Sequence, residues 1–180
     1  MSKKALIAMS GGVDSSVAAA KMVEAGYDCL GVTMRLHDGD NCGAAKEAED
    51  ARKIAQALGF PFEVADLREM FSAQVMDRFV SAYEEGDTPN PCIECNRHLK
   101  FDAFLRRAEE LGCDFVVTGH YARIRQDEKS GRYLLYKAED RSKDQTYFLY
   151  MLKQEQLQNA IRHVTGQSFP MALRRKQQVK

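Results

Sequence analysis

The sequence predicts an α/β domain in which helices flank a mainly parallel sheet. Short apolar runs typical of strands alternate with helical patterns, and glycines or prolines separate them. Because a strand, a helix and a second strand in this order normally form a right-handed crossover, neighbouring strands are expected to run parallel. The chain has 180 residues, of which 44% are hydrophobic and 29% charged, a composition typical of one globular domain.

The expected elements follow one another regularly. Strands are predicted at about 4–9, 29–34, 61–65 and 114–118, followed by a hairpin at 121–125 and 133–137. Helices are predicted at about 14–25, 44–58, 67–84 and 98–111. Pro89 and Pro91 interrupt the chain before the last of these helices. In the third helix, the helical spacing of Phe71, Val75 and Phe79 predicts that they lie in the core.

Charge is divided unevenly along a chain whose formal net charge is zero. Residues 1–90 carry nine Lys and Arg against fifteen Asp and Glu, whereas residues 91–180 carry seventeen against eleven. This asymmetry favours contact between the second half and a polyanion, although ordinary solvated helix faces would give the same counts. No run of 18 apolar residues is present, and the first residues do not resemble a signal peptide. We therefore expect a cytoplasmic protein without a membrane segment.

Residues 10–16, SGGVDSS, form the turn between the first strand and the first helix. A helix start offers unpaired N–H groups and the positive end of the helix dipole, which suit phosphate. Gly11 and Gly12 allow close backbone approach, and the serines add hydroxyl groups. The Asp14 carboxylate would suit such a site if a divalent cation such as Mg²⁺ lay beside it. The alternative is that the glycines only allow the tight turn between the strand and the helix, and that the turn binds no ligand.

Ligands of parallel sheets bind at the carboxyl ends of the strands. The glycine turn, Met34 and the pair Gly119 and His120 all follow predicted strands. We therefore expect these residues to lie near one another.

Five cysteines are present, and two of them form a Cys-x-x-Cys pair, Cys92 and Cys95. Such a pair serves as half of a zinc site, as a redox pair, as cluster ligands, or as a nucleophile with its neighbour. Buried, inert thiols are expected at Cys29 and Cys113, and the role of Cys42 is left open.

Cys95 precedes a predicted helix that begins near residues 96–98, with Arg97 and His98 close by. A thiol near a helix start and cationic side chains is expected to have a lowered pKa. Cys95 is therefore a candidate nucleophile or sulfur carrier, and a non-catalytic loop cysteine is the alternative.

Two motifs resemble known families. Residues 10–15, SGGVDS, resemble the pyrophosphate loop of the ATP pyrophosphatases, which include GMP synthetase. Residues 87–101, DTPNPCIECNRHLKF, resemble the cysteine loop of the tRNA-specific 2-thiouridylases. Segments similar to others of that family follow the same order, at 31–34 (GVTM), 118–123 (TGHYAR) and 143–149 (KDQTYFL). The resemblance covers about residues 3–160.

The resemblance implies a Rossmann-like fold of the adenine nucleotide alpha hydrolase type. It also implies an ATP-dependent tRNA sulfurtransferase, which adenylates the wobble uridine and then transfers sulfur from a cysteine persulfide. The implied cofactors are ATP and Mg²⁺, and the implied partners are tRNA and a sulfur-relay protein or cysteine desulfurase as the persulfide donor. In the family two cysteines share sulfur transfer, the Cys95 equivalent and a more C-terminal one, and they can form a disulfide.

The resemblance also implies roles for particular residues. Cys95 and Asp14 are the implied catalytic residues, and Asp14 would hold Mg²⁺ through ATP. The implied nucleotide-binding residues are Ala8, Met9, Ser10, Gly11, Gly12, Val13, Asp14, Ser15, Met34 and Gly119. The implied tRNA-binding residues are Asn90, Pro91, Cys92, His120, Lys143, Asp144 and Gln145.

The chain also departs from the family pattern. Residues 1–160 are predicted to form the ATP-binding catalytic domain, with its cysteine loop at 86–97. Residues 161–180 form an atypical basic tail with five Lys and Arg and no acids, interpreted as an altered chain end or a basic arm for RNA. The family's central and C-terminal tRNA-binding domains are expected to be absent, with the partner cysteine beyond Lys180, so complete thiolation is expected to be impaired.

Three alternatives stay open. Cys92 stands where some relatives have aspartate, so an iron–sulfur cluster on the cysteine pair is a minority interpretation. A GMP synthetase-like amidotransferase would share the pyrophosphate loop and would have no use for Cys95. A nucleotide-binding remnant without full activity is the third alternative.

Overall fold

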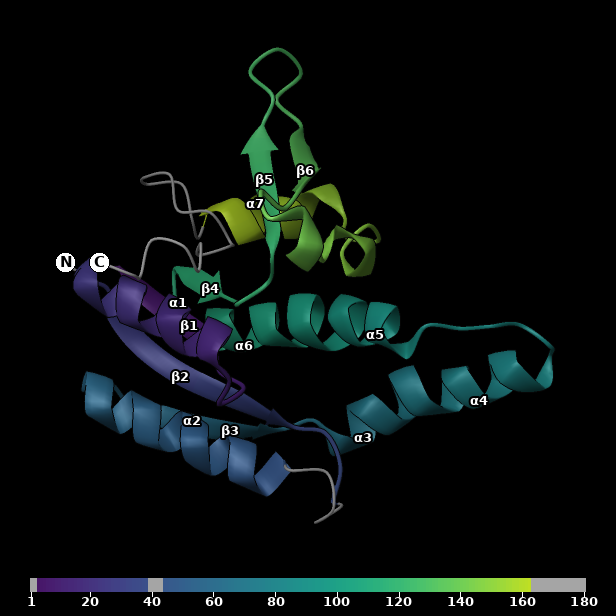
Figure 1. The fold of residues 1–180 in the computed structure, drawn as a ribbon, viewed down its shortest axis with the longest axis horizontal. Helices are drawn as coiled ribbons and strands as arrows, with labels where there is room; N and C mark the ends of the chain where they lie inside the picture. Colours follow the sequence, from purple (N-terminus) through teal and green to yellow (C-terminus); the bar gives the residue numbers. More distant parts are fainter. Residues whose placement is uncertain (1–2, 39–43, 163–180) are drawn as a thin grey trace.

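The computed structural model describes residues 3–38 and 44–162 (Figure 1). Strands and helices alternate in the first half of the chain, as the sequence predicts. The elements are β1 (Lys4–Ala8), α1 (Val13–Glu24), β2 (Asp28–Arg35), α2 (Ala44–Leu58) and β3 (Phe62–Asp66). None of the helices in the described ranges is long and apolar enough to cross a membrane.

The main sheet has four parallel strands in the order β3-β2-β1-β4, where β4 is Phe115–Val117. Leu6 of β1 lies in register with Leu30 of β2 on one side and with Val116 of β4 on the other. The chain builds outward from β1 to β3 and then returns to the opposite side of β1. The predicted parallel α/β fold is confirmed, and its topological switch point lies between β1 and β4.

Both faces of this sheet are covered (Figure 1). One face carries α1 and α2, and its buried core consists of Ala5, Ile7, Met9, Ala19, Met22, Cys29, Ala51, Ala55 and Phe60. The other face carries α6 (Phe104–Glu110), and its buried core consists of Leu6, Leu30, Val32, Phe104, Ala108 and Val116. Successive side chains of a strand point to opposite faces, so β1 contributes alternately to both cores. Cys29 is buried as predicted, and burial raises the pKa of its thiol to about 11.

The predicted helix at 67–84 is continuous but contains a wider turn. It comprises α3 (Arg68–Phe71), the π-helical segment η2 (Ser72–Met76) and α4 (Asp77–Glu84). Val75 is buried as predicted, whereas Phe71 and Phe79 are only half-buried. The prediction of a core stripe is therefore only partly right, because this helix extends beyond the edge of the sheet and finds fewer packing partners there (Figure 1).

The predicted break at the two prolines is present, but the next helix begins earlier than predicted. It starts at Pro91 rather than near His98, and it runs through α5 (Pro91–Glu94), the π-helical η3 (Cys95–Ala103) and α6. The Asn90 side chain caps it by accepting a hydrogen bond from the Cys92 backbone N–H at 3.0 Å. Proline is favourable in a first turn because its missing N–H is not needed there, so Pro91 starts this helix instead of preventing it.

The predicted hairpin forms between β5 (Ala122–Gln126) and β6 (Tyr133–Lys137), which pair antiparallel. The short helices η4 (Arg141–Lys143) and η5 (Thr146–Phe148) and the helix α7 (Gln154–Arg162) follow. A third core joins this unit to the long helix, and its buried residues are Phe101, Ala122, Leu149, Leu152 and Leu157. The long helix therefore packs against the sheet through α6 and against the hairpin unit through η3.

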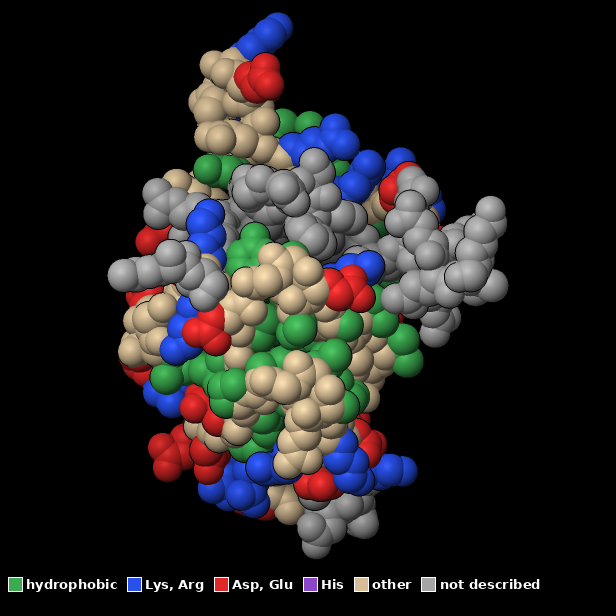
Figure 2. All heavy atoms as spheres, turned by 90° about the vertical axis from the view of Figure 1, so that its left-hand side faces the viewer, with side chains coloured by type: hydrophobic (Ala, Val, Ile, Leu, Met, Phe, Trp, Pro, Cys, Tyr) green, Lys and Arg blue, Asp and Glu red, His purple; other side chains and the backbone are tan. Residues whose placement is uncertain are grey.

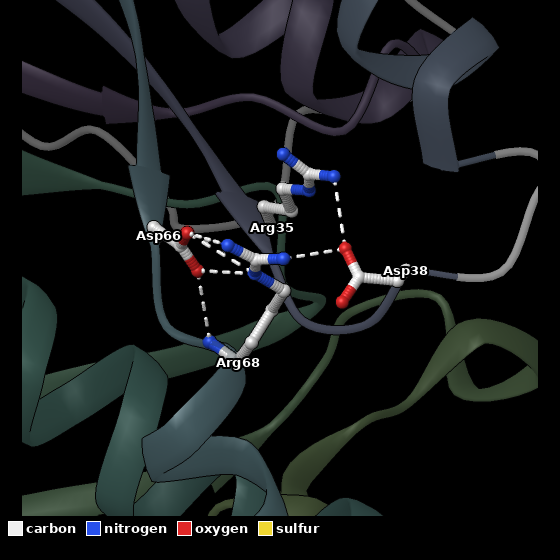
Figure 3. A network of polar contacts seen from close by, with 4 residues as sticks. All are labelled: Arg35, Asp38, Asp66 and Arg68. Atoms are coloured by element: carbon white, nitrogen blue, oxygen red, sulfur yellow. Dashed lines mark hydrogen bonds and ion pairs between the residues drawn. The ribbon is translucent and has the colours of Figure 1, made fainter.

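Charged side chains fix the carboxyl ends of β2 and β3 (Figure 3). Arg68 lies between Asp66 and Asp38 and donates to both, and Arg35 donates to Asp38 at 2.9 Å. The Arg68 hydrogen bonds lower the pKa of Asp66 to about 2. The network thus ties the chain just after β2 to the start of α3. Seen from the left-hand side of Figure 1, the molecule has hydrophobic side chains in the middle of its surface and charged side chains around them (Figure 2).

We expect Leu6→Ala to lower the free energy of unfolding by about 2–5 kcal/mol, because Leu6 is fully buried at the centre of the sheet and the substitution leaves a cavity. Urea unfolding followed by circular dichroism measures this change. Leu134→Ala is the matched control, because Leu134 is 38% exposed on the hairpin. Equal losses for the two variants would contradict the assignment of the core.

Candidate active site

A cavity of about 240 Å³ lies at the carboxyl ends of the central strands, beside the switch point between β1 and β4. Its lining residues come from four regions: the first two strands with the glycine turn, the long helix, the segment just after β4, and the segment after β6. They are Ala8, Met9, Ser10, Asp14, Ser15, Val32, Met34, Lys100, Phe104, Thr118, Gly119, His120 and Gln145. Since ligands of open α/β sheets bind at this position, the cavity is the candidate active site.

The glycine turn leaves the start of α1 without a side-chain cap. Gly12 is the N-cap residue, and no side chain accepts a hydrogen bond from the first turn. Gly11 has a φ of 72°, and a Cβ there would lie 2.6 Å from the backbone oxygen of Glu47. Only glycine suits that position. The hydroxyls of Ser15 and Ser16 both donate to the Gly12 backbone oxygen, so in this structure they shape the turn itself.

Gly119 brings the end of β4 against the start of α1. A Cβ at Gly119 would lie 3.0 Å from the backbone nitrogen of Ser15 and 3.1 Å from the carbonyl carbon of Asp14. Any larger residue would push the strand end and the helix start apart. Asp14 is exposed at the cavity, and the hydroxyl of Tyr121 donates a 2.7 Å hydrogen bond to its carboxylate.

His120 is buried in the wall of the cavity, with only 9% of its surface exposed. Its Nδ1 lies 2.9 Å from the Thr118 hydroxyl, and its ring packs beside the Phe101 ring at 5.7 Å between centroids. Burial, with a contribution from the positive charge of Lys100, lowers the pKa of His120 from 6.5 to about 3. His120 is therefore a neutral imidazole that faces the cavity rather than the open surface.

The expected lowering of the Cys95 pKa is wrong. Burial raises the pKa of this half-buried thiol, the Lys100 ammonium lowers it, and Cys92 raises it further. The physical reason is that the helix begins at Pro91, so Cys95 lies inside the helix rather than at its start. The His98 side chain, which was expected to lower the pKa of Cys95, instead lies 3.1 Å from the Glu94 carboxylate.

Asn96, next to Cys95, is 4% exposed. Its amide nitrogen donates to the Cys92 backbone oxygen at 2.8 Å. Its side-chain oxygen is buried and has no hydrogen-bond partner among the described residues. Most buried side-chain oxygens accept a hydrogen bond, so this unpaired oxygen next to the candidate nucleophile Cys95 is unusual.

The structure places nine of the predicted site residues in the wall of the cavity: Ala8, Met9, Ser10, Asp14, Ser15, Met34, Gly119, His120 and Gln145. Gly11, Gly12 and Val13 form the adjoining turn, where Val13 is 60% exposed. Four others, Asn90, Pro91, Cys92 and Cys95, lie at the start of the long helix and do not line the cavity.

The last two lie on the segment after β6. Lys143 is exposed, whereas both carboxylate oxygens of Asp144 accept hydrogen bonds within the segment, from the Ala138 N–H and the Thr146 hydroxyl. Asp144 thus holds this segment together, next to Gln145.

Sequence reasoning missed four cavity residues, Val32, Lys100, Phe104 and Thr118. Thr118 and Val32 could have been found from their places near the carboxyl ends of strands. Lys100 and Phe104 could not, because their helix was expected to begin near residue 98. Within residues 3–38 and 44–162, no three His, Cys, Asp or Glu side chains come together as a metal site. Cys42 and the predicted basic tail from residue 163 onward lie outside the described residues.

A family model described as the tRNA methyl transferase HUP domain matches residues 3–180. The chain belongs to this family. The tRNA-specific 2-thiouridylase MnmA of Clostridioides difficile is 52% identical over 168 residues, covering 89% of this chain and 46% of the relative. The enzyme of the same name from Clostridium acetobutylicum is 48% identical over 169 residues, covering 89% of this chain and 47% of the relative. The resemblance that the motifs indicated is thus confirmed.

This member of the family spans about half the length of the curated relatives that it matches. Among solved structures, a 4-thiouridine synthetase in complex with RNA and bound ATP covers 66% of this chain and 29% of its own. It is 23% identical and has a TM-score of 0.49.

The environment of His120 predicts a pH dependence of stability. The folded chain takes up this proton only near pH 3, whereas the unfolded chain takes it up near 6.5. The free energy of unfolding should therefore fall as the pH drops from 6.5 towards 3, by up to about 1.4 kcal/mol per pH unit from this residue. Chemical unfolding at a series of pH values measures the slope.

His120→Gln should remove this component, whereas His98→Gln, on the same molecule but beside Glu94, should retain it. If His120→Gln leaves the slope as it is in the wild type, His120 does not titrate as its burial indicates.

Proposed function

We propose that this chain is the nucleotide-binding half of an ATP-dependent tRNA sulfurtransferase that 2-thiolates the wobble uridine. The supporting observation is that the uncapped start of α1, the close-approach glycine Gly119 and the acid Asp14 all meet at one cavity. Because the chain spans about half the length of its relatives, we propose the complete reaction for the whole enzyme of which this chain would form the nucleotide-binding part.

The residues present fit ATP. The N–H groups of the first turn of α1 have no side-chain cap and lie at the positive end of the helix dipole, so they suit the leaving pyrophosphate. Ala8, Val32 and Met34 supply an apolar wall for the adenine. Gly119 allows the end of β4 to lie against this helix start, so that both line the cavity where the nucleotide would bind.

Asp14 also fits Mg²⁺, because its carboxylate is exposed at the cavity and carboxylate oxygens are preferred ligands of that ion. When bound, Mg²⁺ would neutralise phosphate charge. The Tyr121 hydroxyl orients the carboxylate by its hydrogen bond to one oxygen.

The target uridine would approach from the side of His120. As a neutral imidazole that shares a hydrogen bond with Thr118, His120 can bond to the edge of a base without carrying charge. Gln145, whose side chain accepts a hydrogen bond from the Tyr121 N–H, lies at the same cavity and links it to exposed Lys143. Asn90, Pro91 and Cys92 would contact tRNA at the start of the long helix, and Lys143 would contact its phosphates.

Cys95 would carry a persulfide supplied by a relay protein or a cysteine desulfurase. Its outer sulfur would attack the activated carbon of the uridine and displace AMP. A partner cysteine from the remaining half of the family's length would then attack the Cys95 sulfur, form a disulfide with it and release the 2-thiouridine. The setting is expected to be the cytoplasm, where tRNA and the relay proteins are found.

The two chemical steps can be separated by substitution. Asp14→Asn should lower ATP–pyrophosphate exchange by about tenfold or more, because it removes a charged partner of the phosphate–cation group. Cys95→Ser should leave the exchange unchanged and abolish sulfur transfer to tRNA, both measured with tRNA and a persulfide donor present.

Cys29→Ser is the matched control, because that thiol is buried in the sheet core away from the cavity. Exchange lost in Cys95→Ser would point to an adenylating enzyme of another class. If ATP binds to the wild type with neither activity, the chain is a nucleotide-binding protein only.

A further inference from the structure

The cation Lys100 lies in the wall of the cavity and is half-buried. Within residues 3–38 and 44–162 it makes no hydrogen bond or ion pair. Its neighbours on the same helix are paired: Arg106 with Asp102 at 3.1 Å, and Arg107 with Glu63 at 3.1 Å. Since a half-buried charge gains stability from a partner, the unpaired ammonium indicates that an anionic ligand binds here.

The opposite wall of the cavity suits the same ligand. The start of α1, which packs on one face of the sheet, presents its N–H groups and the positive end of its dipole to the cavity. Lys100 approaches from the long helix, which covers the other face of the sheet. Phosphate is the anion that both a helix start and a lysine bind well.

The π-helical geometry of η3 connects Lys100 with Cys95. The two are five residues apart, a spacing that in an α-helix would put them about 140° apart around the axis. In a π-helix the backbone bonds join residues i and i+5, so residues at this spacing lie nearly above one another. The segment Cys95–Ala103 is π-helical, and at its end the Phe104 N–H donates to the Leu99 oxygen five residues before it.

This placement has two electrostatic consequences. The positive charge of Lys100 acts on the Cys95 thiol and opposes the effect of its burial. The same charge acts on the His120 ring in the cavity wall. Lys100 is therefore close enough to influence both the candidate nucleophile and the candidate substrate pocket.

We propose that Lys100 is a catalytic residue joining the two parts of the site, in which its ammonium contacts a phosphate of the bound nucleotide and favours the thiolate of Cys95. The inference rests on the proposed function for its nucleotide part. The π-helical turn is what allows one side chain to serve both groups.

The first test measures the affinities of the full chain for ATP, AMP and adenosine by calorimetry. Lys100→Met should weaken ATP binding by about 10- to 100-fold and leave adenosine binding unchanged, because only the phosphates carry charge. Lys100→Arg should retain most of the affinity. AMP weakened together with ATP places the contact at the α-phosphate, and ATP weakened alone places it at the outer phosphates.

Arg106→Met is the matched control, because it removes a cation from the surface of the same helix. Unchanged ATP binding in Lys100→Met, or equal weakening for adenosine, overturns the proposal. If the wild type binds none of the three compounds, the proposed function itself fails. Failure of the Lys100 proposal alone would instead show ATP binding in the wild type that Lys100→Met leaves unchanged.

The second test needs no nucleotide. In a Cys92→Ser background, alkylation of Cys95 by iodoacetamide at neutral pH is followed by mass spectrometry of its peptide. Lys100→Met should slow this reaction by roughly fivefold, because loss of the positive charge reduces the thiolate fraction. Lys100→Arg and Arg106→Met should react at the wild-type rate, and a rate unaffected by Lys100→Met overturns the thiol part.

Discussion

The close approach of β4 to the start of α1 is the constraint on which the rest of the site depends. Gly119 lies so near the Ser15 nitrogen and the Asp14 carbonyl carbon that a side chain there would collide with the backbone. This contact occurs at the switch point, where the chain has returned past β1. It closes one side of the cavity and directs the first turn of α1 towards it. The arrangement of Asp14, His120 and the glycine turn follows from this single approach.

The parallel sheet and many of the cavity residues could be predicted from the sequence, because they follow from local residue patterns. The strand–glycine–helix pattern at residues 4–24 and the alternation of apolar runs fix the parallel sheet, and a parallel sheet brings Met34, Gly119 and the turn to one edge. Cavity residues on strands and strand ends were therefore accessible to sequence reasoning. The core stripe at 67–84 was overestimated, because periodicity shows which side of a helix is apolar but not how far the sheet beneath it extends.

The features around Cys95 could not be predicted for a different reason. The sequence predicts a break that includes Pro91, whereas in the structure Asn90 caps a helix that begins at this proline. That change of a few residues moves Cys95 from the favourable end of a helix dipole into its partly buried interior, where desolvation dominates. With α-helical spacing, Cys95 and Lys100 would lie on different sides of the helix. No residue pattern in the sequence predicts that these nine residues form a π-helix. Residue spacing is informative only once the helix type is known.

The packing around η3 explains how a flexible side chain can be placed so specifically. Leu99 is fully buried, Phe101 is 3% exposed and Phe104 is 2% exposed. Phe101 belongs to the core of the hairpin unit and Phe104 to the core under the sheet. The backbone around Lys100 is thus fixed from two sides, so the direction of its Cα–Cβ bond is determined by apolar contacts and not by any partner of the ammonium. A cation held in this way meets a ligand without first losing a competing ion pair, which is the property that a preorganised binding site requires.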